Sequence, residues 1–168
     1  RLVRPWIRPG TPGFMHRVGG LEKAKDTGNV SYDAKNHEEM VHIRQAKVDK
    51  IADFIPEIKV EIGKENADLC VLGWGSTFGS IKSAVKELIA EGHSVAQVHL
   101  RHMNPFPKNL GSVLGKFKKV LVPEMNNRQL VRLIRDEYMI PAESFTKIQG
   151  LPFNTDEVKK RILETLKK

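Results

Sequence analysis

From residue 68 onward the sequence alternates strand-like and helix-like segments four times, and this alternation limits the possible folds more than any other feature. The run Asp68–Leu72 is almost entirely apolar, which is typical of a parallel strand buried on both faces. The next strands are expected at 95–100, 120–122 and 144–149, and the helices at 81–89, 110–117, 130–138 and 154–166. Strands and helices that alternate at short spacing predict a parallel sheet covered by helices on both faces.

An additional strand precedes this series. Ile58, Val60 and Ile62 alternate with charged residues, which is typical of a half-exposed strand at a sheet edge. Its position predicts an edge strand that can run antiparallel to the others. The predicted fold class is therefore α/β, with three αβα layers and a mainly parallel twisted sheet that carries an antiparallel edge strand.

The beginning of the chain differs in character. Residues 1–35 are rich in glycine and proline and have no periodicity, so they predict an arm or interdomain loop. Because the chain opens on arginine in mid-pattern, we expect it to be part of a longer subunit. Residues 36–168 are expected to form the α/β domain, starting with a helix over 36–55.

Asparagines mark the expected starts of three helices. Asn36 is predicted to cap the first helix and Asn127 the helix over 130–138, because asparagine side chains accept hydrogen bonds from free backbone N–H groups. Asn154 with Glu157 three residues later predicts a capping box at the last helix. In the helix over 130–138, Leu133 is expected on the buried face.

Composition excludes several classes of protein. No apolar run approaches the ~20 residues of a membrane helix, so no membrane association is expected. The net charge is +8, but 28 basic residues are spread among 20 acidic ones and no nucleic-acid-binding motif occurs. These charges favour a solvated surface or an acidic partner. Cys70 is the only cysteine, which excludes an internal disulfide and a cluster site and fits a reducing, cytoplasmic compartment.

Ligands of parallel sheets bind beyond the carboxyl ends of the strands, and three segments there carry polar groups. The turn over 73–79 follows a strand and opens a helix, so Gly75 and Ser76 could face a ligand. Its third glycine is one position late for a dinucleotide fingerprint, and no acidic residue follows the second strand. A free-standing nucleotide-binding enzyme is the alternative interpretation of this turn.

Glu124 and Asn126 follow the third buried strand. A carboxylate at this position either orients a ligand or accepts hydrogen bonds from nearby backbone amides, and we favour the second role. His37 and His42 are five residues apart and point in different directions on a helix, so they do not form a metal pair. We predict no catalytic residue and no metal site in this chain.

The N-terminal arm carries a second group of candidates. Guanidinium, imidazole and hydroxyl groups in a rigid Gly/Pro-rich loop suit the recognition of carboxylate or phosphate. The candidate residues are Arg4, Arg8, Thr11, His16 and Arg17. An interface arm with solvated charges is the other interpretation.

These segments resemble one family. The stretch PGTPGFMHRVGGLEKAKDTGNVSYD, followed in order by LGWGSTFGSIKSAV, HLRHMNPFPKNL, KVLVPEMNNRQLVRLIR and KIQGLPF, resembles the C-terminal part of alpha subunits of 2-oxoacid:ferredoxin oxidoreductases, especially the 2-oxoglutarate type. The resemblance covers nearly the whole chain. It implies a fold like the C-terminal domain of transketolase.

The resemblance also implies a function. Such enzymes decarboxylate a 2-oxoacid oxidatively with coenzyme A and pass electrons to ferredoxin. Thiamine diphosphate, Mg²⁺ and an iron–sulfur cluster are then expected in other parts of the enzyme, and no cofactor is expected on this chain alone. The expected partners are the beta subunit, with ferredoxin and coenzyme A through the full complex. The chain itself is expected to be structural and interfacial, with the arm near substrate or coenzyme A.

Overall fold

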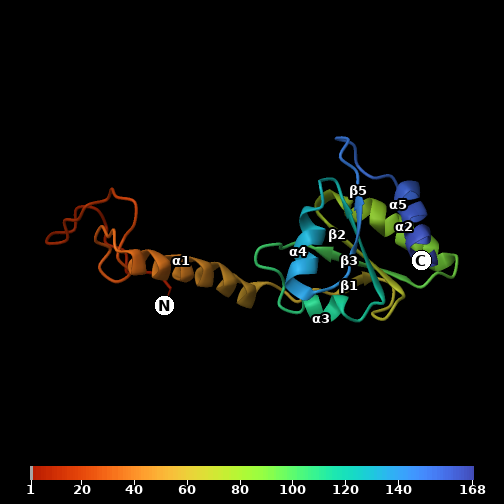
Figure 1. Ribbon diagram of the computed structural model, residues 1–168, viewed down its shortest axis with the longest axis horizontal. Coiled ribbons are helices and arrows are strands. Elements are labelled where there is room, and N and C mark those ends of the chain that lie inside the picture. Colours follow the sequence, from red (N-terminus) through yellow and green to blue (C-terminus); the bar gives the residue numbers. More distant parts are fainter. Residues whose placement is uncertain (1) are drawn as a thin grey trace. The chain divides into compact units, whose positions relative to one another are not determined.

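The computed structural model describes residues 2–168 and shows two compact units that divide between Phe54 and Ile55 (Figure 1). The prediction placed this boundary at residue 35. The first helix, α1 (Ala34–Asp49), groups with the N-terminal unit, and none of its residues is buried. A helix without a buried stripe adds little to a hydrophobic core, which explains why the α/β unit is smaller than predicted.

The α/β unit contains a five-stranded sheet in the order β1-β3-β2-β4-β5. Four strands are parallel, and β1 runs antiparallel to β3 at one edge, which confirms the predicted sheet. β2 and β3 pair over six positions. The strands span Val60–Ile62 (β1), Leu69–Trp74 (β2), Val95–Leu100 (β3), Lys119–Glu124 (β4) and Glu143–Thr146 (β5).

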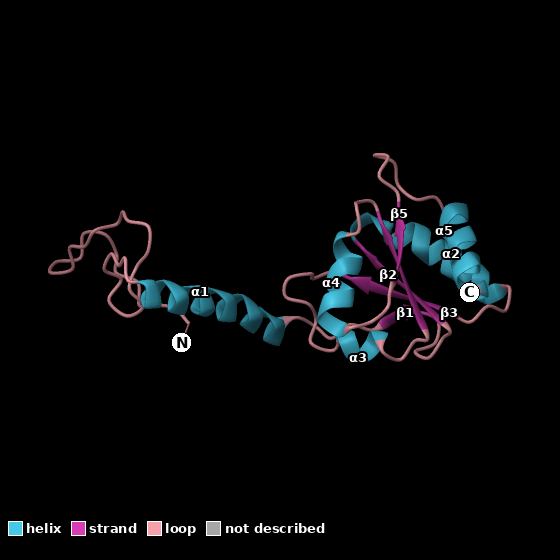
Figure 2. Ribbon diagram, in the orientation of Figure 1, coloured by secondary structure: helices cyan, strands magenta, loops and turns pink. Residues whose placement is uncertain are grey.

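Helices cover both faces of the sheet, as Figure 2 shows. α2 (Phe78–Ala90) and α5 (Thr155–Lys167) pack on one face, and α3 (Leu110–Leu114) and α4 (Gln129–Tyr138) on the other. Two hydrophobic clusters result, separated by the sheet. Side chains of β2 alternate between them, with Leu69 and Val71 in one and Cys70 and Leu72 in the other, and all four are fully buried. The predicted three-layer architecture is confirmed.

The caps agree only in part with the sequence. Asn154 and Glu157 form the predicted capping box, with reciprocal backbone contacts of 2.8 and 2.9 Å. The prediction of Asn36 as a cap was wrong, because α1 begins two residues earlier and Asp33 accepts the N–H of Asn36 at 2.8 Å. Propensity at these positions does not separate aspartate from asparagine, so only the chain path decides.

The start of α4 also differs from the prediction. Asn127 does not cap this helix; Asn126 Oδ1 accepts the N–H of Gln129 at 2.9 Å instead. The fully buried Glu124 carboxylate accepts the next two N–H groups, those of Leu130 (2.6 Å) and Val131 (3.1 Å). Arg128 turns the chain into the helix with a left-handed backbone, φ 63°.

The buried stripe of α4 consists of Leu130, Val131 and Ile134, and Leu133 lies outside it and is 48% exposed, so the predicted burial of Leu133 was wrong. β5 is shorter than the predicted strand over 144–149. Ile148 and Leu151 are exposed, and Gly150 has a positive φ of 68° that breaks the extended path.

The N-terminal unit has no buried residue among those described, 2–54. Its order comes from polar contacts. A short hairpin is closed by a bridge between Lys23 and Val30. Glu22 joins it to α1: its carboxylate oxygens lie 3.1 and 3.4 Å from two Arg44 guanidinium nitrogens and 2.9 Å from Nδ1 of His37. α1 is followed by a 3-10 turn, Lys50–Phe54. Over residues 2–168, none of the helices has both the length and the apolar content that crossing a bilayer requires.

The buried cap at α4 generates a stability prediction. In Glu124→Gln, one carboxylate oxygen becomes an NH2 group that faces a backbone N–H, so one buried donor loses its acceptor. We expect the free energy of unfolding to fall by about 2 kcal/mol and the melting temperature by about 4 °C. Thermal and urea unfolding measure this. Glu137→Gln on the exposed face of the same helix is the matched control, and equal losses in both variants would contradict the cap assignment.

The Glu22 contacts generate a pH prediction. The Arg44 guanidinium, followed by His37, lowers the pKa of Glu22 from 4.5 to about 2. A depressed carboxyl pKa means that these contacts favour the ordered hairpin above pH 4.5 and lose that effect as pH falls through about 2. In carbon-13 NMR, the chemical shift of the Glu22 carboxyl should change with a midpoint near pH 2. Arg44→Ala should return the midpoint towards 4.5, whereas His42→Ala on the same helix should leave it unchanged.

Candidate functional site

The carboxyl ends of β2 and β4 lie where the general rule for such sheets places a ligand crevice, because the connections from these neighbouring strands leave in opposite directions. The predicted residues Gly75, Ser76, Glu124 and Asn126 all lie on the segments that leave these two strands. Ser76 Oγ lies 3.9 Å from the sulfur of Met125, so the two segments are in contact. The structure therefore brings these four predicted residues to one edge of the sheet.

The polar groups at this crevice are already engaged within the chain. Glu124 and Asn126 hold the first free N–H groups of α4, so these donors are not available to an anion. The interpretation of Glu124 as an acceptor for backbone amides is what the structure shows. A ligand-facing role for it and for Asn126 stays a prediction.

Local packing and backbone conformation explain the glycines of the turn over 73–79. A Cβ at Gly73 would lie 2.5 Å from Ile81 Cδ1, so this glycine lets α2 approach the sheet closely. Gly75 has a φ of 56°. Thr77 closes the turn, since its hydroxyl donates to the carbonyl of Trp74 (2.8 Å) and accepts the N–H of the same residue (3.1 Å). Turn geometry and packing account for the pattern that resembled a dinucleotide fingerprint.

His99 lies at the end of β3 and is 6% exposed. Its ring packs edge-on against Phe78, with 4.9 Å between centroids, and its Nδ1 has no hydrogen-bond partner. Burial lowers the pKa of His99, and the charge of Arg101 lowers it further, so the imidazole is neutral at pH 7. Burial raises the pKa of the Cys70 thiol, which is fully buried in β2 and has no access to solvent. His99 also lines a surface pocket together with Glu61, Arg101 and His102, so only Cys70 is fully shut off from a ligand in solvent.

A pocket of about 440 Å³ in the N-terminal unit gathers positive charge. It brings together three of the five predicted arm residues, Arg4, His16 and Arg17, and adds Lys23, which the sequence analysis did not single out. Asp26 is its only acidic residue. The remaining lining is Pro5, Ile7, Phe14, Val18, Thr27 and Gly28. This cationic pocket suits an anion with an apolar portion.

Several of these side chains are held in position by backbone carbonyls. Arg4 Nη1 donates to the carbonyl of Ala24 at 2.6 Å, and Lys23 Nζ donates to those of Arg17 (2.7 Å) and Gly19 (2.8 Å). His16 Nδ1 lies 2.9 Å from the carbonyl of Phe14. These contacts fix the loop and leave the Arg17 guanidinium as the cation with no acceptor in the described part of the chain.

Arg8 and Thr11 are not part of this pocket. The Thr11 hydroxyl donates to the carbonyl of Arg8 at 2.7 Å, so both belong to an exposed turn of their own. Lys23 could have been found from the sequence only by knowing that the hairpin over 22–31 folds back onto the arm. Within residues 2–168, no cluster of three or more histidine, cysteine, aspartate or glutamate side chains is arranged to hold a metal ion.

Comparison with known proteins places these features in a family. Residues 67–161 match the family described as pyruvate:ferredoxin oxidoreductase core domain II. The chain is 44% identical over 157 residues to a protein of Mycobacterium tuberculosis named 2-oxoglutarate oxidoreductase subunit KorA, covering 94% of this chain and 24% of that protein. The chain spans about a quarter of the length of the curated relatives it matches.

Two solved structures are similar. The first is 2-oxoglutarate:ferredoxin oxidoreductase from Magnetococcus marinus, solved with 2-oxoglutarate, coenzyme A and succinyl-CoA bound; it is 35% identical, with a TM-score of 0.84 over 96% of this chain and 28% of that chain. The second is a split-gene transketolase, 18% identical, with a TM-score of 0.50 over 62% of this chain and 40% of that chain. The transketolase shows the fold alone and agrees with the predicted transketolase-like architecture.

The family match spans more than half of the chain and coincides with the α/β unit from just before β2 to the middle of α5. The relatives extend the similarity into the N-terminal arm. This chain belongs to the core domain II family of pyruvate:ferredoxin oxidoreductases, in the form found in alpha subunits of 2-oxoacid:ferredoxin oxidoreductases.

Proposed function

We propose that this chain is the core domain II portion of an alpha subunit that acts on 2-oxoglutarate. The enzyme would decarboxylate this 2-oxoacid oxidatively to its acyl-CoA and pass the electrons to ferredoxin. The observation that carries the proposal is the 44% identity across 94% of the chain with a protein named for 2-oxoglutarate. The Magnetococcus marinus relative, which was solved with 2-oxoglutarate and coenzyme A, supports the same substrate.

Within that enzyme the chain has a structural and interfacial role, and the reacting groups belong to other parts. The polar residues at the crevice of the sheet cap helices and close turns. Cys70 is fully buried, and His99 is 6% exposed at the wall of a surface pocket. These assignments favour a domain that shapes and positions its neighbours rather than one that supplies a general acid, base or nucleophile.

Iron–sulfur clusters and a metal ion held by this chain alone do not fit the described residues, and thiamine diphosphate is expected together with its Mg²⁺ elsewhere in the enzyme. A cluster needs about four thiolate ligands, and this chain has one cysteine, which is buried in β2. The described residues offer no metal-binding group of three. We therefore assign these cofactors to other domains or subunits of the enzyme, where the electrons would leave the reaction.

The N-terminal unit is the part suited to contact the rest of the enzyme. Trp6 is 96% exposed and Met15 is 99% exposed. Large apolar side chains that are this exposed mark surfaces that bind another protein or domain. We infer that the arm packs on neighbouring parts of the complex, including the beta subunit. In that complex ferredoxin and coenzyme A would be partners of the whole enzyme, working in the cytoplasm.

The cationic pocket of the arm is the place where this chain would meet an anionic ligand. Arg17 is its free guanidinium, Arg4 and Lys23 add positive charge, and Phe14 and Ile7 add apolar surface. Substrate carboxylates and coenzyme A phosphates are the anions of the proposed reaction. A guanidinium at such a pocket strengthens binding by charge-assisted hydrogen bonds without entering the chemical step.

The assembled oxidoreductase carrying Arg17→Ala tests this role. We expect the KM for 2-oxoglutarate or for coenzyme A to rise roughly tenfold with kcat little changed, because binding is lost equally in the ground and transition states. Steady-state kinetics with each substrate varied in turn measure this. Arg17→Lys should recover part of the loss, since it keeps the charge but not the fork geometry.

Arg8→Ala is the matched control, because Arg8 lies in the same arm but outside the pocket. Its kinetic constants should equal those of the unmodified enzyme. Unchanged KM values for both substrates in Arg17→Ala would contradict the proposal that this pocket binds either of them. A complete lack of 2-oxoglutarate turnover in the unmodified assembled enzyme would contradict the proposed function itself.

A further inference from the structure

The strand β5 leaves one edge of the sheet open. Within residues 2–168 it pairs with β4 alone, and the N–H of Lys147 just beyond its end donates to the carbonyl of Glu124 at 3.0 Å. The backbone N–H and C=O groups of successive residues in a strand point to opposite sides. Those of Phe145 and Lys147 therefore point towards β4, and those of Ser144 and Thr146 point away from the sheet. The carbonyl of Ser144 has only a long contact, 3.4 Å from Arg161 Nη2. The edge can therefore accept another strand.

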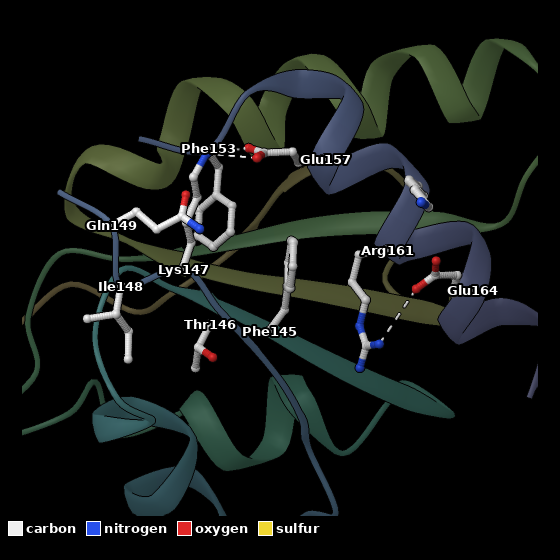
Figure 3. A pocket seen from close by; sticks show the side chains of 10 residues that line it. Phe145, Thr146, Lys147, Ile148, Gln149, Phe153, Glu157, Arg161 and Glu164 are labelled. Carbon is white, nitrogen blue, oxygen red and sulfur yellow. Dashed lines mark hydrogen bonds and ion pairs between the residues drawn. The ribbon is translucent and has the colours of Figure 1, made fainter. Parts of the chain in front are cut away.

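A groove lies beside this edge, lined by residues of β5, of the loop that follows it and of α5 (Figure 3). Its volume is about 410 Å³. The rings of Phe145 and Phe153 form its apolar floor, with 4.7 Å between their centroids. Lys160 and Glu164 of α5 line it as well, four residues apart and so on the same face of the helix. The groove thus presents apolar surface next to charges of both signs.

The sequence of this edge complements itself. Reading Glu143-Ser144-Phe145-Thr146-Lys147 against its own reverse pairs glutamate with lysine, serine with threonine, and phenylalanine with phenylalanine. An interface with a twofold axis needs such a self-complementary surface. If residue i of one copy contacts residue j of the second, then residue j of the first copy contacts residue i of the second. The outward backbone groups obey the same symmetry, since Ser144 and Thr146 lie equally far on either side of Phe145.

We propose that two copies of this chain associate through antiparallel pairing of their β5 edges, with the twofold axis at Phe145. The outward N–H and C=O groups of Ser144 would exchange hydrogen bonds with those of Thr146 in the second copy, and the reverse. The two Phe145 residues form a pair without backbone hydrogen bonds, whose Cα atoms approach to about 4.5 Å. The two five-stranded sheets then continue as one sheet across the molecule.

Charge complementarity selects this register. Centred on Phe145, the pairing brings the carboxylate of Glu143 opposite the ammonium of Lys147 at both ends. Centred on Thr146 instead, it would put Phe145 opposite Lys147 and leave Glu143 without an opposite charge. Lys160 and Glu164 on α5 add a second self-complementary set of charges beside the strand. Opposite charges across an interface mainly set orientation and register.

These charged residues also have partners within one chain. Lys147 Nζ lies 2.8 Å from both Glu157 carboxylate oxygens, and Glu143 is 3.2 Å from Arg161 and 2.9 Å from Lys168. In the dimer, Glu143 and Lys147 would keep these partners within the chain and face each other across the axis as well. The apolar contact at Phe145 and the backbone hydrogen bonds therefore carry the attraction, and the interface belongs to the weak, concentration-dependent class.

Substitution at Thr146 tests the pairing with a matched control. Proline there removes an N–H that faces outwards and makes no contact with β4, so the chain can fold while the edge is blocked. Thr146→Val keeps the N–H. Sedimentation of the full 168-residue chain from about 10 μM to about 1 mM should show the 19.0 kDa monomer approaching twice that mass for the unmodified chain and Thr146→Val, and only monomer for Thr146→Pro.

Hydrogen exchange of the unmodified chain gives a second readout that does not depend on the folding of a variant. The amides of Ser144 and Thr146 should exchange several-fold more slowly at the highest concentration than at the lowest, while those of β1 at the opposite edge should not change. A chain that stays monomeric throughout, a Thr146→Pro variant that associates like the unmodified chain, or β5 amides whose exchange ignores concentration would each overturn the proposal.

Discussion

Burial of β2 on both faces is the constraint on which the rest of the α/β unit depends. Leu69 to Leu72 have no exposed surface, and each neighbouring side chain enters a different hydrophobic cluster. A strand of this kind needs paired strands on both sides and a layer of helices above and below. The order β3-β2-β4, with α2 and α5 on one face and α3 and α4 on the other, meets both needs. The transketolase-like fold follows from this arrangement.

The same arrangement brings together the carboxyl ends of β2 and β4, where sheets of this kind bind ligands. In this chain the polar side chains there cap a helix instead. Glu124 is held within the core and stabilises the start of α4, because a buried carboxylate needs donors and the helix supplies two. In open α/β sheets this edge is the usual place for a bound ligand. Here its polar groups are committed, which agrees with a domain whose task in the proposed enzyme is to position its neighbours.

The N-terminal unit follows a different principle. Without a buried side chain over residues 2–54, its order comes from exposed polar contacts such as those of Glu22. Contacts of this kind contribute little in water, and ordering a residue costs about 1–2 kcal/mol of backbone entropy. A segment so arranged gains its stability from what it packs against. This reason, together with its cationic pocket, is the basis for our proposal that the arm contacts other parts of the enzyme.

Much of this could be predicted from the sequence, since hydrophobic periodicity is local. The continuous apolar run that begins at Leu69 and the alternation before Ile62 determined the strand types, and Asn154 with Glu157 determined a helix start. The order of motifs indicated the family. The sequence did not show which residues cap α4, because the Glu124 carboxylate reaches the N–H groups of Leu130 and Val131 only through the turn at Arg128.

Side chains far apart along the chain meet only in the tertiary structure. The periodicity of the sequence determined the layers of this protein and the direction of its strands, since those depend on which residues avoid water. The grouping of Arg4, Arg17 and Lys23 in one pocket and the open edge of β5 were decided by folding alone. The physical reason is that pockets and free edges arise from the relative positions of segments, which no local pattern encodes.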